Sequence, residues 1–538
     1  MERKHLDSLS STFDGKLTSG SNISYWIDSI SPLKFEPLNE NIEIEVVVIG
    51  AGISGITTAY CLAKSGKKVV VLEDGYIGSG ETGRTTAHIV NALDDRYSEI
   101  ERYHGLEGSK QAADSHTAAI AFIESISIEE NIDCDFKRLN GYLFLHPTDK
   151  QKTLEDEFEA THRAGIHTEL IIGVPGIPVE EGLCLKFPHQ ATFHPMKYLS
   201  GLTNAFIRLG GKVYTETHAQ EIKEGEVIAN GFNITAKDIV VATNTPINDM
   251  FTMHTKQYPY RTYVIASIIP KGSVDSALWW DTGDQHSKSF NIPYNYVRIQ
   301  EYNEQYDLII CGGADHKTGQ ADKENLSAED RYRILEDWMR QRFTNVLETV
   351  YRWSGQVMDP VDSLGYIGKN PGDKNIYIVT GDSGNGMTHG TIAGILLDDL
   401  INGRENPWEK LYDPSRITLK ASKDFISENI NVAAQYGDFL SKSDIQSTQE
   451  LKLDEGAIIN SGLKKVAVFK DKDGQIHAYS AICPHLGCVL QWNGEEKSFD
   501  CPCHGSRFTC EGKVVNGPAL SDLEEVQLKE DSSLKKRA

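Results

Sequence analysis

The sequence predicts an α/β domain followed by a small all-β domain, and three observations support this fold class. The stretch IEIEVVVIG from Ile42 is an apolar run of strand length, and a mostly α/β pattern continues to about residue 410. Near the end of the chain, short alternating stretches such as KKVAVFK and QIHAYSAI are separated by DKDG and Gly/Pro turns. A chain of 538 residues also exceeds one ordinary hydrophobic core, so two or more domains are expected.

Changes in composition along the chain predict four segments. Residues 1–40 are rich in Ser, Asn and Asp and are expected to form an irregular arm. Residues 41–410 form the α/β domain, and residues 411–448 are polar with weak helical spacing, which is typical of a connector. Residues 449–538 form the all-β domain.

Composition and charge exclude several classes of function. Hydrophobic residues make up 39% of the chain and charged residues 24%, as in globular proteins. The net charge of -23 argues against nucleic acid or an anionic membrane as a partner, because both attract Lys and Arg. Since the sequence has no apolar run of membrane-spanning length and no signal peptide, it predicts a cytoplasmic protein without a transmembrane segment.

The first candidate site is a dinucleotide-binding unit in VVVIGAGISGITTAYCLAKSGKKVVVLED. Gly50 permits a tight turn, Gly52 lets the backbone approach a pyrophosphate, and Gly55 permits close packing of the following helix. Glu73 ends the second strand, where an acid accepts hydrogen bonds from ribose hydroxyls. Because no basic residue stands there, the unit favours FAD or NAD over NADP.

Three further stretches favour FAD. They are GSGETGRTTAHI (78–89), AKDIVVATNTP (236–246) and NIYIVTGDSGNGMTHGTIAGILLDDLI (375–401). With the glycine-rich unit, they resemble the FAD-dependent oxidoreductases of D-amino acid oxidase, glycine oxidase and sarcosine oxidase type over about residues 42–410. The resemblance implies a Rossmann-like FAD-binding domain with an interleaved β-sheet substrate domain.

The resemblance also implies which residues contact FAD. The late glycine-rich turn would place a helix N-terminus at the flavin pyrimidine edge, where its positive end stabilises the anion of reduced flavin. Ala219 stands where the family usually has a Val whose backbone meets adenine. The implied contacts beyond the first glycine-rich unit are Arg84, Thr85, Ala219, Gly381, Gly384, Asn385, Gly386, Met387 and Thr388.

The substrate side departs from the amino acid oxidases. Those enzymes offer an arginine to the substrate carboxylate late in the chain, whereas this chain has Gln356 at that place. A neutral amide cannot bind a carboxylate bidentately, which argues against an α-amino acid substrate. Tyr263, Arg298 and His389 are candidates for catalysis, although a structural role is the simpler interpretation of each, and no catalytic base is assigned.

The second candidate site is a cluster of cysteines and histidines. Five of the nine cysteines fall between Cys483 and Cys510. Two loops each supply one thiolate and one imidazole, from Cys483 and His485 and from Cys501 and His504. Zinc accepts such a ligand set. A zinc site would not need the two further cysteines, Cys488 and Cys503.

The stretches CPHLGC, CPCHGS and GPA at residue 517 resemble the Rieske [2Fe-2S] domain of the bc-complex subtype. This implies that Cys483 and Cys501 bind one iron, that His485 and His504 bind the other, and that a disulfide joins Cys488 and Cys503. Neutral imidazole ligands raise the potential of such clusters to about -150 to +300 mV. The extra cysteine pair favours the electron-transfer subtype over the oxygenases, which also need a separate iron site.

Two residues after CPCHG bear on the potential. Ser506 matches the position whose hydroxyl hydrogen-bonds a cluster sulfur in high-potential members. Those members carry a tyrosine two residues later, where this chain has Phe508. Because hydrogen bonds to the sulfurs stabilise the reduced cluster, the sequence predicts a lower potential within the Rieske range.

Together the two sites predict a flavin-dependent dehydrogenase that joins two-electron to one-electron chemistry. It would oxidise a small amine, amino acid or hydroxy compound and pass electrons singly through the cluster to an external acceptor, a protein or a quinone-like molecule. The alternative is a redox-sensing or electron-transfer protein in which turnover is incidental. The acidic composition disfavours a third possibility, tRNA modification.

Overall fold

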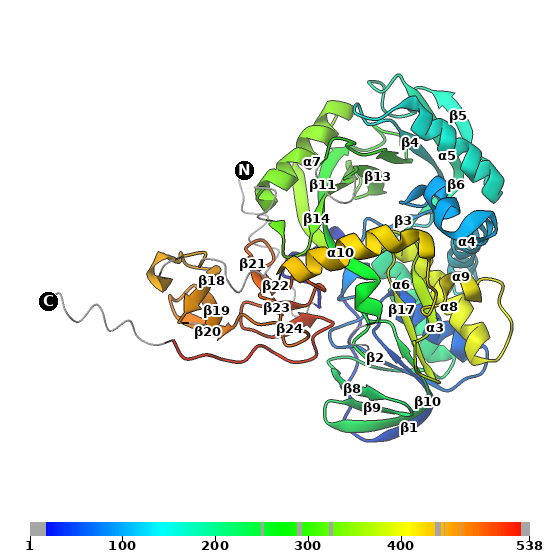
Figure 1. The fold of residues 1–538 in the computed structure, drawn as a ribbon. Helices are drawn as coiled ribbons and strands as arrows, with labels where there is room; N and C mark the ends of the chain where they lie inside the picture. Colours follow the sequence, from blue (N-terminus) through cyan, green and yellow to red (C-terminus); the bar gives the residue numbers. More distant parts are fainter. Residues whose placement is uncertain are drawn as a thin grey trace.

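The computed structural model describes most of the chain (Figure 1). The described residues are 18–248, 252–287, 293–321, 326–435, 443–445, 447–462 and 464–528. Parts of all four predicted segments lie outside them: residues 1–17 of the arm, residues 249–251, 288–292 and 322–325 of the α/β domain, residues 436–442 and 446 of the connector, and residues 463 and 529–538 of the last domain.

The larger part of the molecule holds the strands between Ile42 and Thr380. One of its two sheets has eight strands. Its order is β16-β17-β10-β1-β2-β7, with β8 and β9 attached beside β10, and β7, β2, β1, β10 and β17 run parallel. The bounds are β1 Ile42–Ile49, β2 Val69–Leu72, β7 Lys212–Tyr214, β8 Ala219–Lys223, β9 Glu226–Ala229, β10 Phe232–Val241, β16 Tyr366–Lys369 and β17 Ile376–Thr380. Alternate residues of β1 pack into two different cores, which explains its unbroken run of valines.

Two helices cover one face of this sheet and begin where its strands end. They are α3 (Ile53–Lys64), which follows β1, and α8 (Gly386–Ile401), which follows β17. They pack closely, because a Cβ on Gly394 would lie 2.6 Å from the side chain of Thr57. Helix α6 (Pro195–Arg208) packs on the other side of α3. The glycines of GTIAGI therefore bring two helix N-termini to one edge of the sheet.

A nine-stranded sheet of order β15-β11-β14-β13-β12-β4-β6-β3, with β5 beside β6, lies next to the first sheet (Figure 1). Its bounds are β3 His88–Ile89, β4 Lys137–Phe144, β5 Glu169–Ile172, β6 Leu183–Thr192, β11 Gln257–Pro270, β12 Leu278–Asp281, β13 Tyr296–Glu301, β14 Tyr306–Lys317 and β15 Thr349–Pro360. The flanking helices are α4 Arg96–Glu129, α5 Gln151–Ala164 and α7 Ala328–Arg342. The chain alternates between the two sheets, so the predicted α/β class with an interleaved sheet domain is confirmed.

Beyond the short helix α9 (Glu409–Tyr412), helix α10 (Ser422–Gln435) crosses the molecule toward a small all-β part (Figure 1). This part, the C-terminal domain, contains a three-stranded and a four-stranded sheet, as the sequence predicted. Its strands are β18 Glu455–Ser461, β19 Lys464–Lys470, β20 Ile476–Ser480, β21 Gln491–Asn493, β22 Ser498–Asp500, β23 Arg507–Thr509 and β24 Val514–Asn516.

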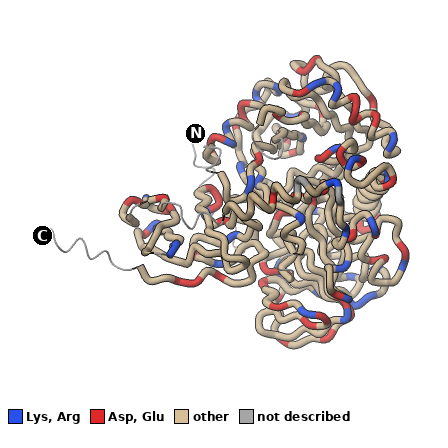
Figure 2. Tube along the Cα trace, viewed as in Figure 1, with Lys and Arg blue, Asp and Glu red and all other residues tan. Residues whose placement is uncertain are grey.

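A buried carboxylate joins the C-terminal domain to the rest of the chain. Glu496, in the turn between β21 and β22, accepts hydrogen bonds from Arg84 at 3.0 Å and from Arg261 of β11 at 2.7 Å. The Asn22 backbone N–H and the Ser354 hydroxyl also donate to it. Its side chain and that of Arg261 are each 0% exposed. Most other charges lie interspersed along the chain in both signs (Figure 2).

The surroundings of Glu496 keep it ionised. Burial alone would raise the pKa of this carboxyl, but the charges of Arg84, Arg261 and Arg507 outweigh burial and hold the pKa well below its usual value of 4.5. Such a group stabilises the fold above the pKa that it has in the unfolded chain. This contribution is lost as the pH falls from about 4.5 toward the folded-state pKa.

We expect Glu496→Gln to lower the free energy of unfolding by about 3–5 kcal/mol, because it leaves buried arginines without their counter-charge. Urea titrations at neutral pH would measure the loss. Glu495→Gln is the matched control, since burial raises the pKa of Glu495 and its charge is already unfavourable. Equal stability of Glu496→Gln and the wild type would contradict the role given to this carboxylate.

Glu496→Gln also tests how the free energy of unfolding depends on pH. Between about pH 4.5 and pH 3, the unfolded wild-type chain takes up a proton at residue 496 that the folded chain excludes, so the wild type loses stability. Glu496→Gln lacks this component, and we expect the stability gap between the two proteins to narrow on acidification. A gap that stays constant in thermal scans would show that Glu496 is not the titrating group.

Candidate functional site

The first glycine-rich unit forms one edge of a cavity of about 800 Å³. Gly50 has φ +102°, and a Cβ there would lie 2.4 Å from the carbonyl oxygen of Ala242. A Cβ on Gly55 would lie 1.8 Å from the carbonyl oxygen of Gly50, so only glycine lets α3 approach β1 this closely. Gly50 and Gly52 line the cavity, at the N-terminus of α3.

Glu73 lies at the end of β2 and lines the same cavity. Its carboxylate accepts hydrogen bonds from the backbone N–H groups of Ala51 at 2.7 Å and Gly75 at 2.8 Å. Burial raises the pKa of Glu73, although these N–H groups act in the opposite direction. Ala219, at the start of β8, lines the cavity as well.

The second glycine-rich turn reaches the cavity from β17. Gly381 and Gly384 have φ values of +71° and +73°, and both line the cavity together with Asn385, Gly386 and Met387. Thr388 is turned toward other groups, because its hydroxyl is 2.8 Å from Nδ1 of His116 and donates to the Asn385 carbonyl at 3.1 Å.

The donors of this cavity fit FAD. The N-termini of α3 and α8 both open on it, and their positive ends suit the pyrophosphate and the reduced flavin. The glycines leave room for close approach, and Glu73 offers a carboxylate to ribose hydroxyls. A hollow lined by two helix ends and this acid is large enough for a dinucleotide.

Arg84 and Thr85 lie between the cavity and the C-terminal domain. Both line the cavity, but the Arg84 guanidinium also donates to Glu496, to the Ser354 carbonyl at 2.8 Å and to the Asn22 carbonyl at 2.7 Å. The Thr85 carbonyl accepts from the indole N–H of Trp26. The structure thus gives Arg84 a partner that sequence reasoning missed.

The three catalytic candidates lie in different places. Tyr263 is buried on β11, with its hydroxyl 3.1 Å from Nε2 of His316. Arg298 is 1% exposed and donates to the carbonyls of Ala87 and Phe193, and burial lowers its pKa to about 9.

Only His389 of the three is among the residues that line the cavity, and burial lowers its pKa to about 3.

The cavity wall on the nine-stranded sheet is aromatic and acidic. Tyr258, Tyr260 and Thr262 line it, because alternate residues of β11 face the same side. The sequence pointed instead to Tyr263 of the same strand, which is not among the residues that line the cavity. The carboxyl groups that line the cavity on this side and beside α8 are Asp94, Asp95, Asp281, Asp315, Asp359 and Asp382.

The cysteines and histidines come together in two neighbouring loops. Cys483 and His485 follow β20, and Cys501 and His504 lie between β22 and β23. Each loop is closed by backbone hydrogen bonds, from the N–H of Gly487 to the Cys483 carbonyl and from the N–H of Gly505 to the Cys501 carbonyl. The two imidazole rings lie 5.0 Å apart, centre to centre.

The two thiols form a pair. A hydrogen bond from Cys501 lowers the pKa of Cys483, and the Ser506 side chain acts in the same direction. The Cys501 sulfur lies within 4.8 Å of those of Cys488 and Cys503. Those last two sulfurs are bonded to each other, so they are not available as metal ligands.

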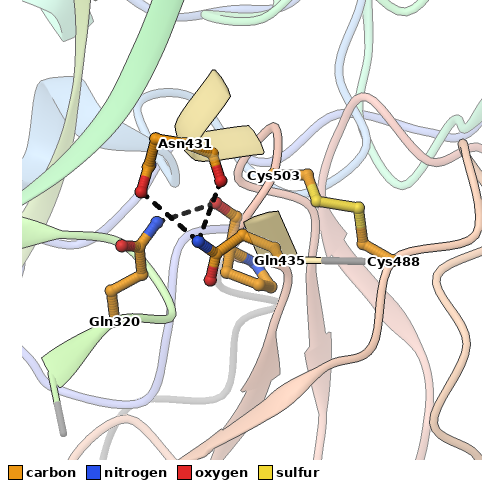
Figure 3. Close-up of a disulfide and its surroundings, with 6 residues drawn as sticks. Gln320, Asn431, Gln435, Cys488 and Cys503 are labelled. Carbon is orange, nitrogen blue, oxygen red and sulfur yellow. Dashed lines mark hydrogen bonds between the residues drawn. A yellow bond between two sulfur atoms is a disulfide. The ribbon is translucent and has the colours of Figure 1, made fainter. Parts of the chain in front are cut away.

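The disulfide between Cys488 and Cys503 joins the two loops (Figure 3). Beside it, the side-chain amide of Gln320 donates to the Pro502 carbonyl at 3.3 Å, and Gln435 of α10 donates to Asn431 in the same helix. Gln320, which follows β14, and Gln435 of α10 thus border the second loop.

The remaining donors fit a [2Fe-2S] cluster. Two thiols and two imidazoles from two loops match the ligand set of a Rieske centre. The Nδ1 atom of His504 is buried and has no hydrogen-bond partner among the described residues, as a nitrogen reserved for metal would be. The additional cysteines are consumed by the disulfide, which leaves one thiol and one imidazole on each loop.

The histidines also contact a residue that the sequence did not indicate. His254, in the segment between β10 and β11, lies 4.9 Å from His485 and 5.8 Å from His504, ring centre to ring centre. Nothing in the polar stretch MHTKQ signals this contact, because it joins segments more than 200 residues apart.

Two substitutions should shift the cluster potential in opposite directions. Phe508→Tyr adds a hydroxyl at the position where high-potential members carry one, and we expect it to raise the midpoint potential. Ser506→Ala removes the hydroxyl at the position that hydrogen-bonds a cluster sulfur in high-potential members, and we expect a lower midpoint. Protein-film voltammetry measures both. An unchanged or lowered midpoint in Phe508→Tyr would refute the assignment of that position.

Comparisons with known proteins agree with these two sites. The family model for FAD dependent oxidoreductase matches residues 45–400, and the model for the Rieske [2Fe-2S] domain matches residues 441–527. The Rieske 2Fe-2S iron-sulfur protein YhfW of Bacillus subtilis (strain 168) is 34% identical over 514 residues, which cover 94% of this chain and 97% of the relative.

Two further similarities each cover about 70% of the chain. Gamma-glutamylputrescine oxidoreductase of Escherichia coli (strain K12) is 27% identical over 380 residues, 69% of this chain and 86% of that protein. The crystal structure of L-proline dehydrogenase from P. horikoshii has a TM-score of 0.55 at 21% identity, and the match covers 70% of this chain and 98% of that one.

Proteins of the first family bind FAD, and Rieske domains bind a [2Fe-2S] cluster, so the expected cofactors are confirmed. No helix among the described residues is long and apolar enough to span a membrane. The chain belongs to the FAD-dependent oxidoreductases of amino acid oxidase type and carries a C-terminal Rieske [2Fe-2S] domain.

Proposed function

We propose that this oxidoreductase is a dehydrogenase that oxidises a small amine. The substrate would give a hydride to FAD and a proton to solvent. The two electrons would then pass singly to the [2Fe-2S] cluster, held by Cys483, Cys501, His485 and His504, and on to an external protein or quinone-like acceptor.

The observation that carries this proposal is that the FAD cavity and the second cluster loop share a wall. Gln356 of β15 lines the FAD cavity, and its side-chain amide donates to the Gly505 carbonyl in the second cluster loop at 3.2 Å. The fit is tight, since a Cβ on Gly505 would lie 2.7 Å from the side chain of Pro259. One layer of side chains therefore separates the cavity from the cluster loop, which favours electron transfer within one chain.

The lining of the cavity favours an amine among the three substrate classes expected from the sequence. Burial raises the pKa of Asp94 to about 8 and that of Asp382 to about 7, as expected for acids that have no cationic partner among the described residues. Arg84 and Arg96 are the Lys or Arg residues among the lining, and both donate to backbone carbonyls. A protonated amine would supply the missing positive charge.

Two further features favour an amine as the substrate. Gln356 replaces the arginine that binds substrate carboxylates in amino acid oxidases, so an α-amino acid finds no such partner there. The relative named gamma-glutamylputrescine oxidoreductase carries an amine in its name, and its match spans 69% of this chain.

The decisive experiment is an anaerobic screen of diamines, monoamines, amino acids and hydroxy acids. With the proper amine we expect the flavin absorbance to bleach and the EPR signal of the reduced cluster to appear in the same sample. In Cys483→Ser, which lacks a cluster ligand, the flavin should still bleach while the EPR signal is absent.

Two results would contradict the proposal. If the wild-type flavin bleached while the cluster stayed oxidised, the internal transfer would be wrong. If no amine bleached the flavin but a hydroxy acid did, the substrate class would be wrong and the electron path could still hold.

A further inference from the structure

We infer that the Rieske domain supplies part of the FAD site of the same chain. The segment Val514–Leu520 forms a wall of the FAD cavity at its adenosine end, and Asn516 is a hydrogen-bond partner of the adenosine portion of FAD. This inference rests on the placement of the dinucleotide along Glu73 given above, and it does not depend on the substrate class.

The first support is position. Six residues between Val514 and Leu520 line the cavity, although they belong to the C-terminal domain. Nε2 of His218 lies 3.4 Å from the Leu520 carbonyl, and a Cβ on Gly517 would lie 2.8 Å from the Ile247 side chain. The segment therefore packs directly onto the larger part of the chain.

The second support is the end of the cavity that this segment covers. His218 and Ala219 line the cavity beside the contact with Leu520, and Asp74 lies 3.4 Å from His218. Asp74 follows Glu73, the expected acceptor for ribose hydroxyls. The N-terminus of α8, expected at the flavin, enters from β17 instead. The segment thus faces adenosine rather than the flavin ring.

The third support is the side chain of Asn516. It lines the cavity and is 8% exposed, and its Oδ1 atom is buried without a hydrogen-bond partner among the described residues. Buried polar atoms in folded proteins are generally satisfied. Adenosine offers the missing donors, since its exocyclic amino group and ribose hydroxyls can each donate to an amide oxygen.

The segment is also tied to the cluster loop. The N–H of Ala519 donates to the Ser506 hydroxyl at 3.0 Å, and Asn516 pairs with Arg507 in the ladder of β24 and β23. The Ser506 carbonyl in turn accepts a hydrogen bond from the backbone N–H of Cys501 at 2.8 Å. One short segment therefore contacts the adenosine end of the cavity and supports the cluster-binding loops.

The test uses the holoenzyme with Asn516→Leu, which keeps the size of the side chain and removes its hydrogen bonds. We expect FAD to bind about tenfold more weakly, measured by flavin fluorescence on dilution, while the cluster keeps its EPR signal. Asn460→Leu is the matched control, because Asn460 is exposed on β18 in the same domain. Wild-type FAD affinity in Asn516→Leu would overturn the inference.

A second measurement needs no variant. In the full-length wild type, hydrogen exchange in the peptide covering Val514–Leu520 should slow when FAD is added to protein stripped of flavin. Unchanged exchange there, with slower exchange around Gly50–Gly55, would overturn the inference even if Asn516→Leu failed to fold. Failure of the amine screen would leave both readouts intact, so the two proposals fail separately.

Discussion

The structure depends on the burial of one negative charge. The removal of Glu496 from water costs free energy, which its hydrogen-bond partners offset. Arg84 and Arg261 of the flavin-binding part donate to it, and so does Asn22 of the N-terminal segment. These partners lie in three stretches of the chain that are far apart in sequence, and Glu496 reaches all of them only when the C-terminal domain is docked. The positions of the cluster loops against β11 and β15, and of Val514–Leu520 against β8, follow from that docking.

Local patterns explain what the sequence could predict. The turn at Gly50 and the helix contact at Gly55 are set by residues a few positions apart, so their spacing was sufficient. Cys488 and Cys503 were paired through a family resemblance that rests on two short stretches, and the structure confirms that disulfide. The assignment of the individual FAD and iron ligands remains a prediction that the geometry supports.

Contacts between distant segments could not be predicted in this way. Glu496 stands in the turn NGEEKS, which has the composition of an exposed loop, and its arginine partners lie more than 200 residues away. On β11 the choice of Tyr263 rather than Tyr260 depended on strand register, since a shift of one residue exchanges the two faces of a strand. Gln356 was recognised as a missing arginine, but its contact with Gly505 needed the docked domain.

The contact of His254 with His485 and His504 has a consequence for the order of events in turnover. With iron on these imidazoles, the edge of the cluster that they present would be covered by the flavin-binding part of the same chain. On the electron path proposed above, an external acceptor that approaches this edge would compete with His254 for one surface. Loading of the cluster from the flavin and its discharge to the acceptor would then alternate in time, and the rate at which the two parts separate would set an upper limit on electron flow.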